Sequence, residues 1–336
     1  MSRSRLLQFT FGLAISLALL YWIFLTVDWE SVYGHLGNMR YWALIPSAVV
    51  LILHFCLRVW RWRYLLSDGD QTTFIQRYDS LMVGNLATFV LPLRAGEFVR
   101  PLMLSRIAAP GFMKAFVSVV LERFFDLATI LFLFAILVMK APGLDPQVYN
   151  AAYSLTLLAV AILLYIVVGS YWPQRIKAVS EKCLSILPRV ISEKLLALID
   201  DLLVGSAVLR NGRSLLAVMF LTALVWGSAL VQHYVFFFFL DLEPTFWLSL
   251  SVMVVIALAV AFPSAPGFLG VFQAGWIGGL AIFEINRDIA VAYSIITHLF
   301  MFTMVIFLGL VSLLKRGLSL GQLTRRNGAG TSAGFA

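Results

Sequence analysis

Long apolar stretches alternate with short polar ones along most of the 336 residues. A helix needs about 20 mostly apolar residues to cross a bilayer, and stretches of this kind recur along the chain. We predict full membrane-spanning helices at 7–27, 41–57, 114–139, 150–170, 214–240 and 289–314. The pattern therefore predicts an all-α polytopic membrane protein with about six full spans.

Two further apolar stretches, 78–106 and 246–283, are interrupted in the middle. The breaks fall at Pro92 and Gly96 in the first stretch and at Pro263 and Gly267 in the second. Basic residues flank both ends of the first stretch, so a single crossing would leave one basic end outside, against the positive-inside rule. We predict two re-entrant helical hairpins, the first inserted from the cytoplasm and the second from outside. Broken backbone at such depth requires surrounding protein or a watery cavity.

The order span, span, hairpin, span occurs twice, and the second copy begins on the opposite side of the membrane. This order predicts an inverted-topology repeat, in which the broken helices meet near the midplane, as in many transporters. The first repeat covers 1–140, with its hairpin at 78–106. The segment 141–213 contains the span 150–170, which begins the second repeat, followed by a cytoplasmic linker. The segment 214–316 completes that repeat and includes the hairpin 246–283. The last residues, 317–336, are expected to be a disordered tail.

The linker shows a different pattern from the spans. Between 174 and 213 apolar residues recur every three or four positions among many charges, and Pro188 divides the run. This spacing predicts two amphipathic helices on the inner face of the membrane, serving as a connector or as a partner-binding segment.

Composition agrees with a membrane protein and excludes several other classes. The chain is 61% hydrophobic and 12% charged, with a net charge of +8 spread over the predicted interfacial loops. No compact basic domain favours nucleic acid, and two cysteines, Cys56 and Cys183, form neither a disulfide framework nor a metal site. We expect no cofactor, no soluble catalytic domain, and a multi-pass location in the cytoplasmic (inner) membrane with both termini cytoplasmic.

Six ionisable residues lie close to the first break. They are Arg94, Glu97 and Arg100 directly after it, and Glu122, Arg123 and Asp126 in the span that follows. An ionisable side chain at membrane depth costs roughly 2.5–3.5 kcal/mol on insertion scales, which makes a functional role the first hypothesis. A half-helix that begins after the break would also direct unpaired N–H groups toward the membrane centre, where an anion can bind.

Two interpretations of this cluster remain open. The six charges sum to zero, so they could pair with one another and clamp the hairpin to the third span. Alternatively, Arg94 and Arg100 could hold a phosphate through paired hydrogen bonds. We expect both to hold in part, with some residues locking the hairpin and others contacting a ligand.

Other polar positions are weaker candidates. Asn85, Gly96, Gly267, Gly270 and Gln273 lie near the breaks and could hold backbone or ligand. The span histidines, His54, His233 and His298, are expected to bond to neighbours. We interpret Arg58, Arg61 and Arg63, interleaved with tryptophans, as a cytoplasmic interfacial belt, and Phe236 to Phe239 as lipid-facing. The run Ser67 to Asp70, SDGD, is read as a solvated turn rather than a metal and nucleotide-sugar site.

Taken together, these motifs resemble the lysylphosphatidylglycerol synthetase transmembrane-region family. The family is the flippase-like module of the bacterial multiple peptide resistance factor, which also occurs alone. The resemblance is carried by Asn85, Pro92, Arg94, Gly96, Glu97, Arg100, Glu122, Arg123, Asp126, Pro263, Pro266, Gly267 and Gly270. The chain departs from the family at Gln273, where relatives commonly have an acid.

The resemblance implies a protein of a bacterial or archaeal inner membrane that moves a lipid between leaflets. It does not extend to the soluble aminoacyl-transferase domain of the bifunctional relatives, so we expect no synthase activity. The predicted partner is a membrane lipid with a polar or anionic head group. The alternatives are a membrane-embedded head-group or glycosyl transferase, or a non-catalytic partner of a cell-envelope lipid-modifying enzyme.

Overall fold

All regular secondary structure in the described part of the chain is helical. The computed structural model describes residues 3–66, 71–91, 94–108, 111–140, 146–185, 188–240, 242–261 and 264–317. The predicted turn at 67–70, the prolines Pro92 and Pro263, and the predicted tail from residue 318 onward lie outside these ranges.

Long helices coincide with the six predicted spans. They are α1 (Arg3–Thr26), α3 (Leu44–Arg63), α6 (Phe112–Val138), α7 (Pro146–Tyr171), α10 (Gly212–Phe236) and α13 (Arg287–Lys315). By length and composition, Tyr41–Arg63, Tyr149–Tyr171, Gly212–Phe239 and Arg287–Lys315 can each cross a membrane; α1 with α2 (Trp29–Gly37), bent by 91°, would make a fifth span. The 27-residue helix α6 is as long as these but carries Glu122, Arg123 and Asp126.

Both interrupted stretches fold as a helix, a break and a second helix. The first pair is α4 (Phe74–Val90) and α5 (Gly96–Ile107); the second is α11 (Phe246–Ala259) and α12 (Val271–Ala281). A threonine caps the first helix of each pair, because the Thr73 hydroxyl accepts from the Gln76 amide and the Thr245 hydroxyl from the Leu248 amide. We call these pairs the first hairpin and the second hairpin.

Glycines allow the two helices of each hairpin to approach closely. A Cβ on Gly96 would stand 2.0 Å from the Gly84 carbonyl oxygen and 2.0 Å from Thr88 Oγ1. In the second hairpin, a Cβ on Gly279 would lie 2.7 Å from Val252 Cα. No side chain fits at either position, so the tight pairing depends on glycine.

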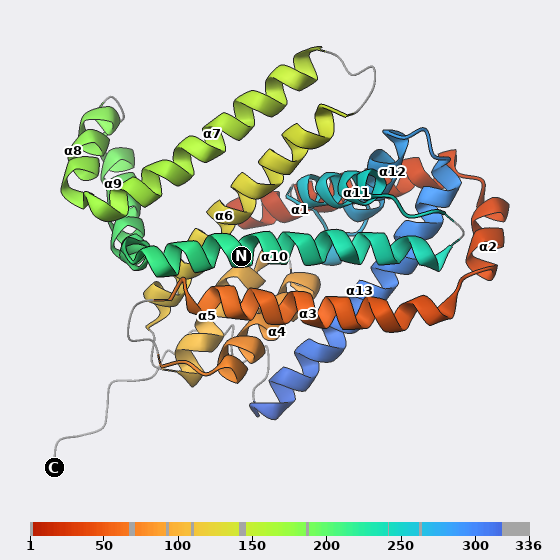
Figure 1. The fold of residues 1–336 in the computed structure, drawn as a ribbon, viewed down its shortest axis with the longest axis horizontal. Helices are drawn as coiled ribbons and strands as arrows, with labels where there is room; N and C mark the ends of the chain where they lie inside the picture. The colour runs from red at the N-terminus through yellow and green to blue at the C-terminus, as the bar shows by residue number, and fades with distance from the viewer. Residues whose placement is uncertain are drawn as a thin grey trace.

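The packing around the two hairpins follows the same pattern in both halves. The first hairpin packs on α6, which follows it, and on α13 from the other half; the second packs on α13 and on α6. Helices α3 and α10, the second long helix of each half, run side by side across the front of Figure 1. The hairpin ends meet, since the rings of Phe89 and Phe268 are 5.6 Å apart.

The linker contains the two predicted helices, α8 (Pro173–Leu184) and α9 (Arg189–Gly205), which lie together at one end of the molecule (Figure 1). Short 3-10 turns, η1 (Tyr41–Ala43), η3 (Ser206–Arg210), η4 (Phe237–Phe239) and η5 (Pro266–Phe268), complete the elements. The prediction that the whole run Phe236 to Phe239 faces lipid is wrong. Phe236, Phe237 and Phe239 are buried and pack around Trp276 and Phe300 beside the second hairpin.

Candidate functional site

Glu122 lies at the centre of a buried charge cluster and contacts four arginines. One carboxylate oxygen, Oε1, is 3.2 Å from Arg58, 3.2 Å from Arg61 and 3.3 Å from Arg123. The other, Oε2, is 2.9 Å from Arg100. The Glu122 side chain has no exposed surface. This single carboxylate therefore connects α3, the first hairpin and α6.

Asp126 lies one helical turn after Glu122 and extends the cluster to α10. Its two oxygens accept hydrogen bonds from the Arg61 guanidinium at 2.7 and 3.3 Å. Trp226 on α10 donates its indole N–H to the same carboxylate at 3.3 Å. The Arg61 guanidinium also donates to Thr222 on α10 at 3.2 Å. The spacing of four residues places both acids on one face of α6, as the sequence predicts.

Arg100 and Arg123 differ in how deeply their side chains are buried. Arg100 is buried, and its guanidinium lies 3.8 Å from the centre of the Trp62 ring as well as against Glu122. Arg123 keeps 45% of its side chain exposed and lies 3.5 Å from the partly exposed Glu97. Arg100 is therefore held between Glu122 and Trp62, whereas the exposed part of Arg123 can contact a ligand.

The interpretation of Arg58 and Arg61 as an interfacial belt is wrong. The Arg61 side chain is fully buried, and Arg58 is 16% exposed, because both point to Glu122 from α3. With them the cluster has four arginines against Glu97, Glu122 and Asp126, so it carries one positive charge in excess rather than none. A signal for this was present in the sequence: His54, Arg58 and Arg61 repeat at helical spacing on one face of α3, while Trp60 points outward and is exposed.

A cavity of about 260 Å³ opens beside the cluster, between the two halves of the molecule. Its walls come from α3, α6, α10, α11, α12 and α13. The lining residues are Leu51, His54, Arg58, Arg123, Asp126, Val225, Trp226, Ala229, Gln232, His233, Phe236, Met253, Ile256, Ala257, Phe272 and Met301.

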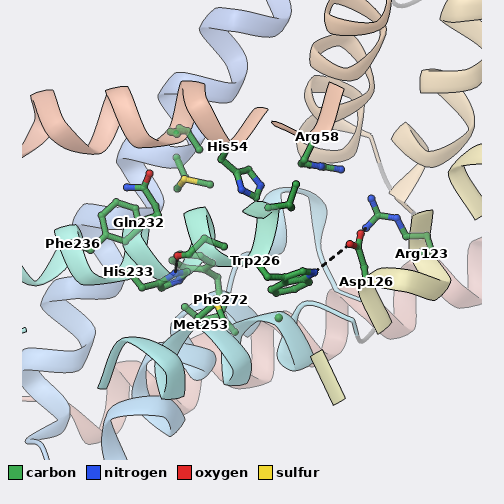
Figure 2. Close-up of a pocket in the computed structure, with 16 residues that line it drawn as sticks. His54, Arg58, Arg123, Asp126, Trp226, Gln232, His233, Phe236, Met253 and Phe272 are labelled. Carbon is green, nitrogen blue, oxygen red and sulfur yellow. Dashed lines mark hydrogen bonds and ion pairs between the residues drawn. The ribbon is translucent and has the colours of Figure 1, made fainter. Parts of the chain in front are cut away.

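Polar groups divide unequally between the two ends of this cavity. Arg58, Arg123 and Asp126 gather at one end, and Gln232 and His233 lie at the other, with Trp226 and His54 between them (Figure 2). The remaining wall is mostly aliphatic and aromatic. One charged end and a long apolar wall suit an amphiphilic ligand.

Of the other predicted residues near the first break, Arg94 forms no ion pair with the cluster in the described part of the chain, but it lies close enough to interact electrostatically with Glu97 and Arg123. It has a positive φ of 51°, and its guanidinium lies 5.4 Å from the centre of the Phe268 ring at the end of the second hairpin. Gly96 serves the close pairing of α4 and α5, and Asn85 is partly buried on α4. The ligand roles of Arg94, Gly96 and Asn85 stay predictions.

The predicted residues of the second break form a hydrogen-bonded ring with α13. The side-chain oxygen of Gln273, Oε1, accepts a hydrogen bond from the Gly270 backbone amide at 2.8 Å. The side-chain NH₂ of Gln273 donates to His298 Nδ1 at 2.9 Å. His298 Nε2 donates to the Gly267 carbonyl at 2.7 Å. Gly267 and Gly270 both have positive φ, 71° and 83°, which glycine adopts without strain. These residues have a structural role in the turn, and their ligand role stays a prediction.

The described residues include no candidate metal centre. Across the described ranges, no three His, Cys, Asp or Glu side chains come together in a way that could hold a metal ion. The charged groups of the site are paired instead with one another.

Fold and site together define an all-helical membrane protein with paired helical hairpins and an amphiphilic cavity between its halves. The chain belongs to the family described as the lysylphosphatidylglycerol synthase TM region, whose model matches residues 9–309. This match confirms the resemblance inferred from the motifs. Neither the curated proteins nor the solved structures yielded a match.

Proposed function

We propose that this protein is a lipid translocator that moves a polar or anionic lipid between the leaflets of the cytoplasmic membrane. The observation that carries this function is the cavity, which is charged at one end and apolar along the rest of its wall. A head group would occupy the cavity while the acyl or isoprenoid chains remain in the bilayer. No chemical step by the protein is part of this function.

The charge balance of the site favours an anionic head group. One positive charge of the cluster has no carboxylate to match it, and Arg58 and Arg123 both line the cavity. Arginine binds phosphate through two parallel hydrogen bonds, and in a site of low dielectric such a contact is stronger than in water. Arg61 and Arg100 would keep the hairpin in place during binding, because both remain paired to buried acids.

Membrane placement is the second part of this proposal. We place α1, α3, α6, α7, α10 and α13 as six spans, with the two hairpins re-entrant from opposite faces as an inverted-topology repeat. The matching contacts of each hairpin with α6 and α13 support this arrangement. The basic ends of α3 and α13 and the amphipathic α8 and α9 support a cytoplasmic side that holds both termini.

Purified protein in liposomes tests this function directly. We would follow the movement of a fluorescently labelled anionic phospholipid from the inner to the outer leaflet, using a membrane-impermeant quencher. The wild type should move lipid well above protein-free vesicles, and the double variant Arg58→Gln, Arg123→Gln should lower the rate by at least about tenfold, since two phosphate contacts are lost. Wild-type vesicles no faster than empty ones would refute translocation.

A matched control separates the cavity from general charge effects. Lys177→Gln removes a positive charge from α8, where Lys177 pairs with Asp200 in the linker. This variant should keep the wild-type rate. If the double variant also kept it while remaining folded, the cavity would not be the route of the lipid.

A further inference from the structure

The end of the cavity away from the charges carries polar groups that the proposed function does not use. Gln232 on α10 is only 4% exposed, and neither its amide nitrogen nor its amide oxygen has a hydrogen-bond partner among the described residues. An unpaired buried amide costs about 1–3 kcal/mol, so a ligand that paired it would recover free energy. Gln232 lines the same cavity as Arg58 and Arg123.

Two histidines of the cavity present hydrogen-bond acceptors: His233 lies at the same end as Gln232, and His54 lies between that end and the charged one. His233 Nδ1 lies 2.8 Å from the Ala229 carbonyl oxygen and must donate to it, which leaves Nε2 of the neutral ring as an acceptor. His54 Nδ1 lies 3.0 Å from the Ser228 hydroxyl, whose own proton goes to the Val225 carbonyl. His54 Nδ1 is therefore also the donor, and its Nε2 is the acceptor.

The donors and acceptors at this end match a hydroxyl group better than a charged one. A phosphate oxygen only accepts, so it would leave the imidazole acceptors unpaired, and an ammonium only donates, so it would leave the Gln232 NH₂ unpaired. Among the lining residues at this end there is no carboxylate to balance an ammonium. A hydroxyl both donates and accepts, and it brings no charge into an apolar wall.

We propose that Gln232, His233 and His54 form a second binding site for the hydroxyl groups of a polyol-phosphate lipid head group. In taking the ligand to be a lipid we rely on the function proposed above. The phosphate contacts Arg58 and Arg123, and the uncharged polyol extends past Trp226 toward Gln232. Gln232 follows Trp226 by six positions, which is about 9 Å along α10. The site selects an unmodified polyol over an aminoacylated one.

Three lipids with the same acyl chains test this selection. Phosphatidylglycerol has the hydroxyls, phosphatidylethanol has the same charge without them, and lysylphosphatidylglycerol adds ammonium groups. We would measure lipid retained by the purified protein with native mass spectrometry. Two or more hydrogen bonds to the hydroxyls predict about tenfold tighter binding of phosphatidylglycerol than of phosphatidylethanol, with lysylphosphatidylglycerol also weaker.

Variants then test whether the preference depends on Gln232 and His233. Gln232→Leu with His233→Phe should bring the ratio of phosphatidylglycerol to phosphatidylethanol binding close to one, while phosphatidylethanol binding stays. Val231→Leu, on the exposed face of α10, is the matched control and should keep the tenfold ratio. Equal binding of both lipids by the wild type would overturn the second site, and so would an equal loss of both lipids in the double variant.

The same measurements separate this site from translocation. Selective retention of phosphatidylglycerol without any movement between leaflets would support the hydroxyl site and refute the proposed function. A competition experiment with soluble glycerol 3-phosphate completes the test, because this compound has the same head-group chemistry without acyl chains. It should not displace the lipid at equal concentration; displacement would show that the site takes a soluble polyol phosphate instead.

Discussion

The two hairpins share an outline but are held in place by different interactions. Each starts at a threonine cap, pairs its helices through glycine, and packs on both α6 and α13. The first is fixed by ion pairs, chiefly from Arg100 to Glu122. The second is fixed by neutral hydrogen bonds, chiefly the ring through Gln273 and His298. The same backbone arrangement is therefore stabilised once by charge and once without it.

This difference between the hairpins indicates which part of the molecule binds the charged group of a ligand. Buried charges are costly unless they are paired, and a cluster that keeps one charge in excess is stable only where solvent or a ligand can reach it. Arg123, which is half exposed, provides that access beside the first hairpin. The second hairpin supplies Met253, Ile256 and Phe272 to the apolar wall of the cavity. The charged end of the cavity thus comes from α3 and α6, beside the first hairpin, whereas the second hairpin provides part of its apolar wall.

The largest expected effect comes from neutralising the centre of the charged cluster. Glu122→Gln leaves Arg58, Arg61 and Arg100 without their shared carboxylate in a buried site, which should cost about 3–5 kcal/mol of stability. Equilibrium unfolding by SDS in mixed micelles measures the loss. Glu97→Gln is the control, because Glu97 is partly exposed and its ion pair with Arg123 is long, at 3.5 Å. Similar stability of the two variants would mean that the first hairpin does not depend on the buried pair.

Close pairing through glycine should matter in both hairpins, with a somewhat smaller effect. Gly96→Ala and Gly279→Ala each introduce a Cβ that collides with backbone atoms of the partner helix, so we expect about 2–3 kcal/mol of destabilisation. Gly227→Ala on α10 is the matched control, since a Cβ there meets nothing within 4 Å, and it should be neutral or stabilising. If only one of the two variants lost stability, close pairing through glycine would not be a shared feature of the two hairpins.

Much of the fold could be predicted from the sequence because apolar length and breaks are local signals. Every predicted span contains a long helix, and both breaks at proline and glycine give two paired helices. The short connection between the first two predicted spans contains α2, because Asp28 caps a nine-residue amphipathic helix there. Six spans with two re-entrant hairpins in an inverted repeat remain a prediction about placement in the bilayer.

The site was harder to predict, since its composition depends on which helices meet. Glu97, Arg100, Glu122, Arg123 and Asp126 come together as expected from their closeness in sequence. Arg58 and Arg61 come from a distant helix, and the neighbouring tryptophans gave them the pattern of an interfacial belt. Gln232 and His233 lie in an otherwise apolar span, where a single sequence gives no sign that α10 borders a cavity.

The hydrogen-bonded ring of the second hairpin gives a third, smaller test. His298→Phe removes a donor to Gly267 and an acceptor from Gln273, which should destabilise the protein by about 1–3 kcal/mol. Gln273→Leu should cost a similar amount, and the double variant should cost little more than either alone, because both act on one network. Fully additive losses would show that the two side chains stabilise the turn independently.

The smallest effect is expected where the two hairpins touch. The Arg94 guanidinium lies over the Phe268 ring at 5.4 Å, which links the end of the charged hairpin to the end of the neutral one. A double-mutant cycle with Arg94→Leu and Phe268→Leu should give a coupling of about 0.5–1 kcal/mol in unfolding experiments. The sign is informative: a favourable coupling means that each hairpin stabilises the other, as expected if their ends move together. A coupling near zero would mean that the two hairpins are independent units that merely lie side by side.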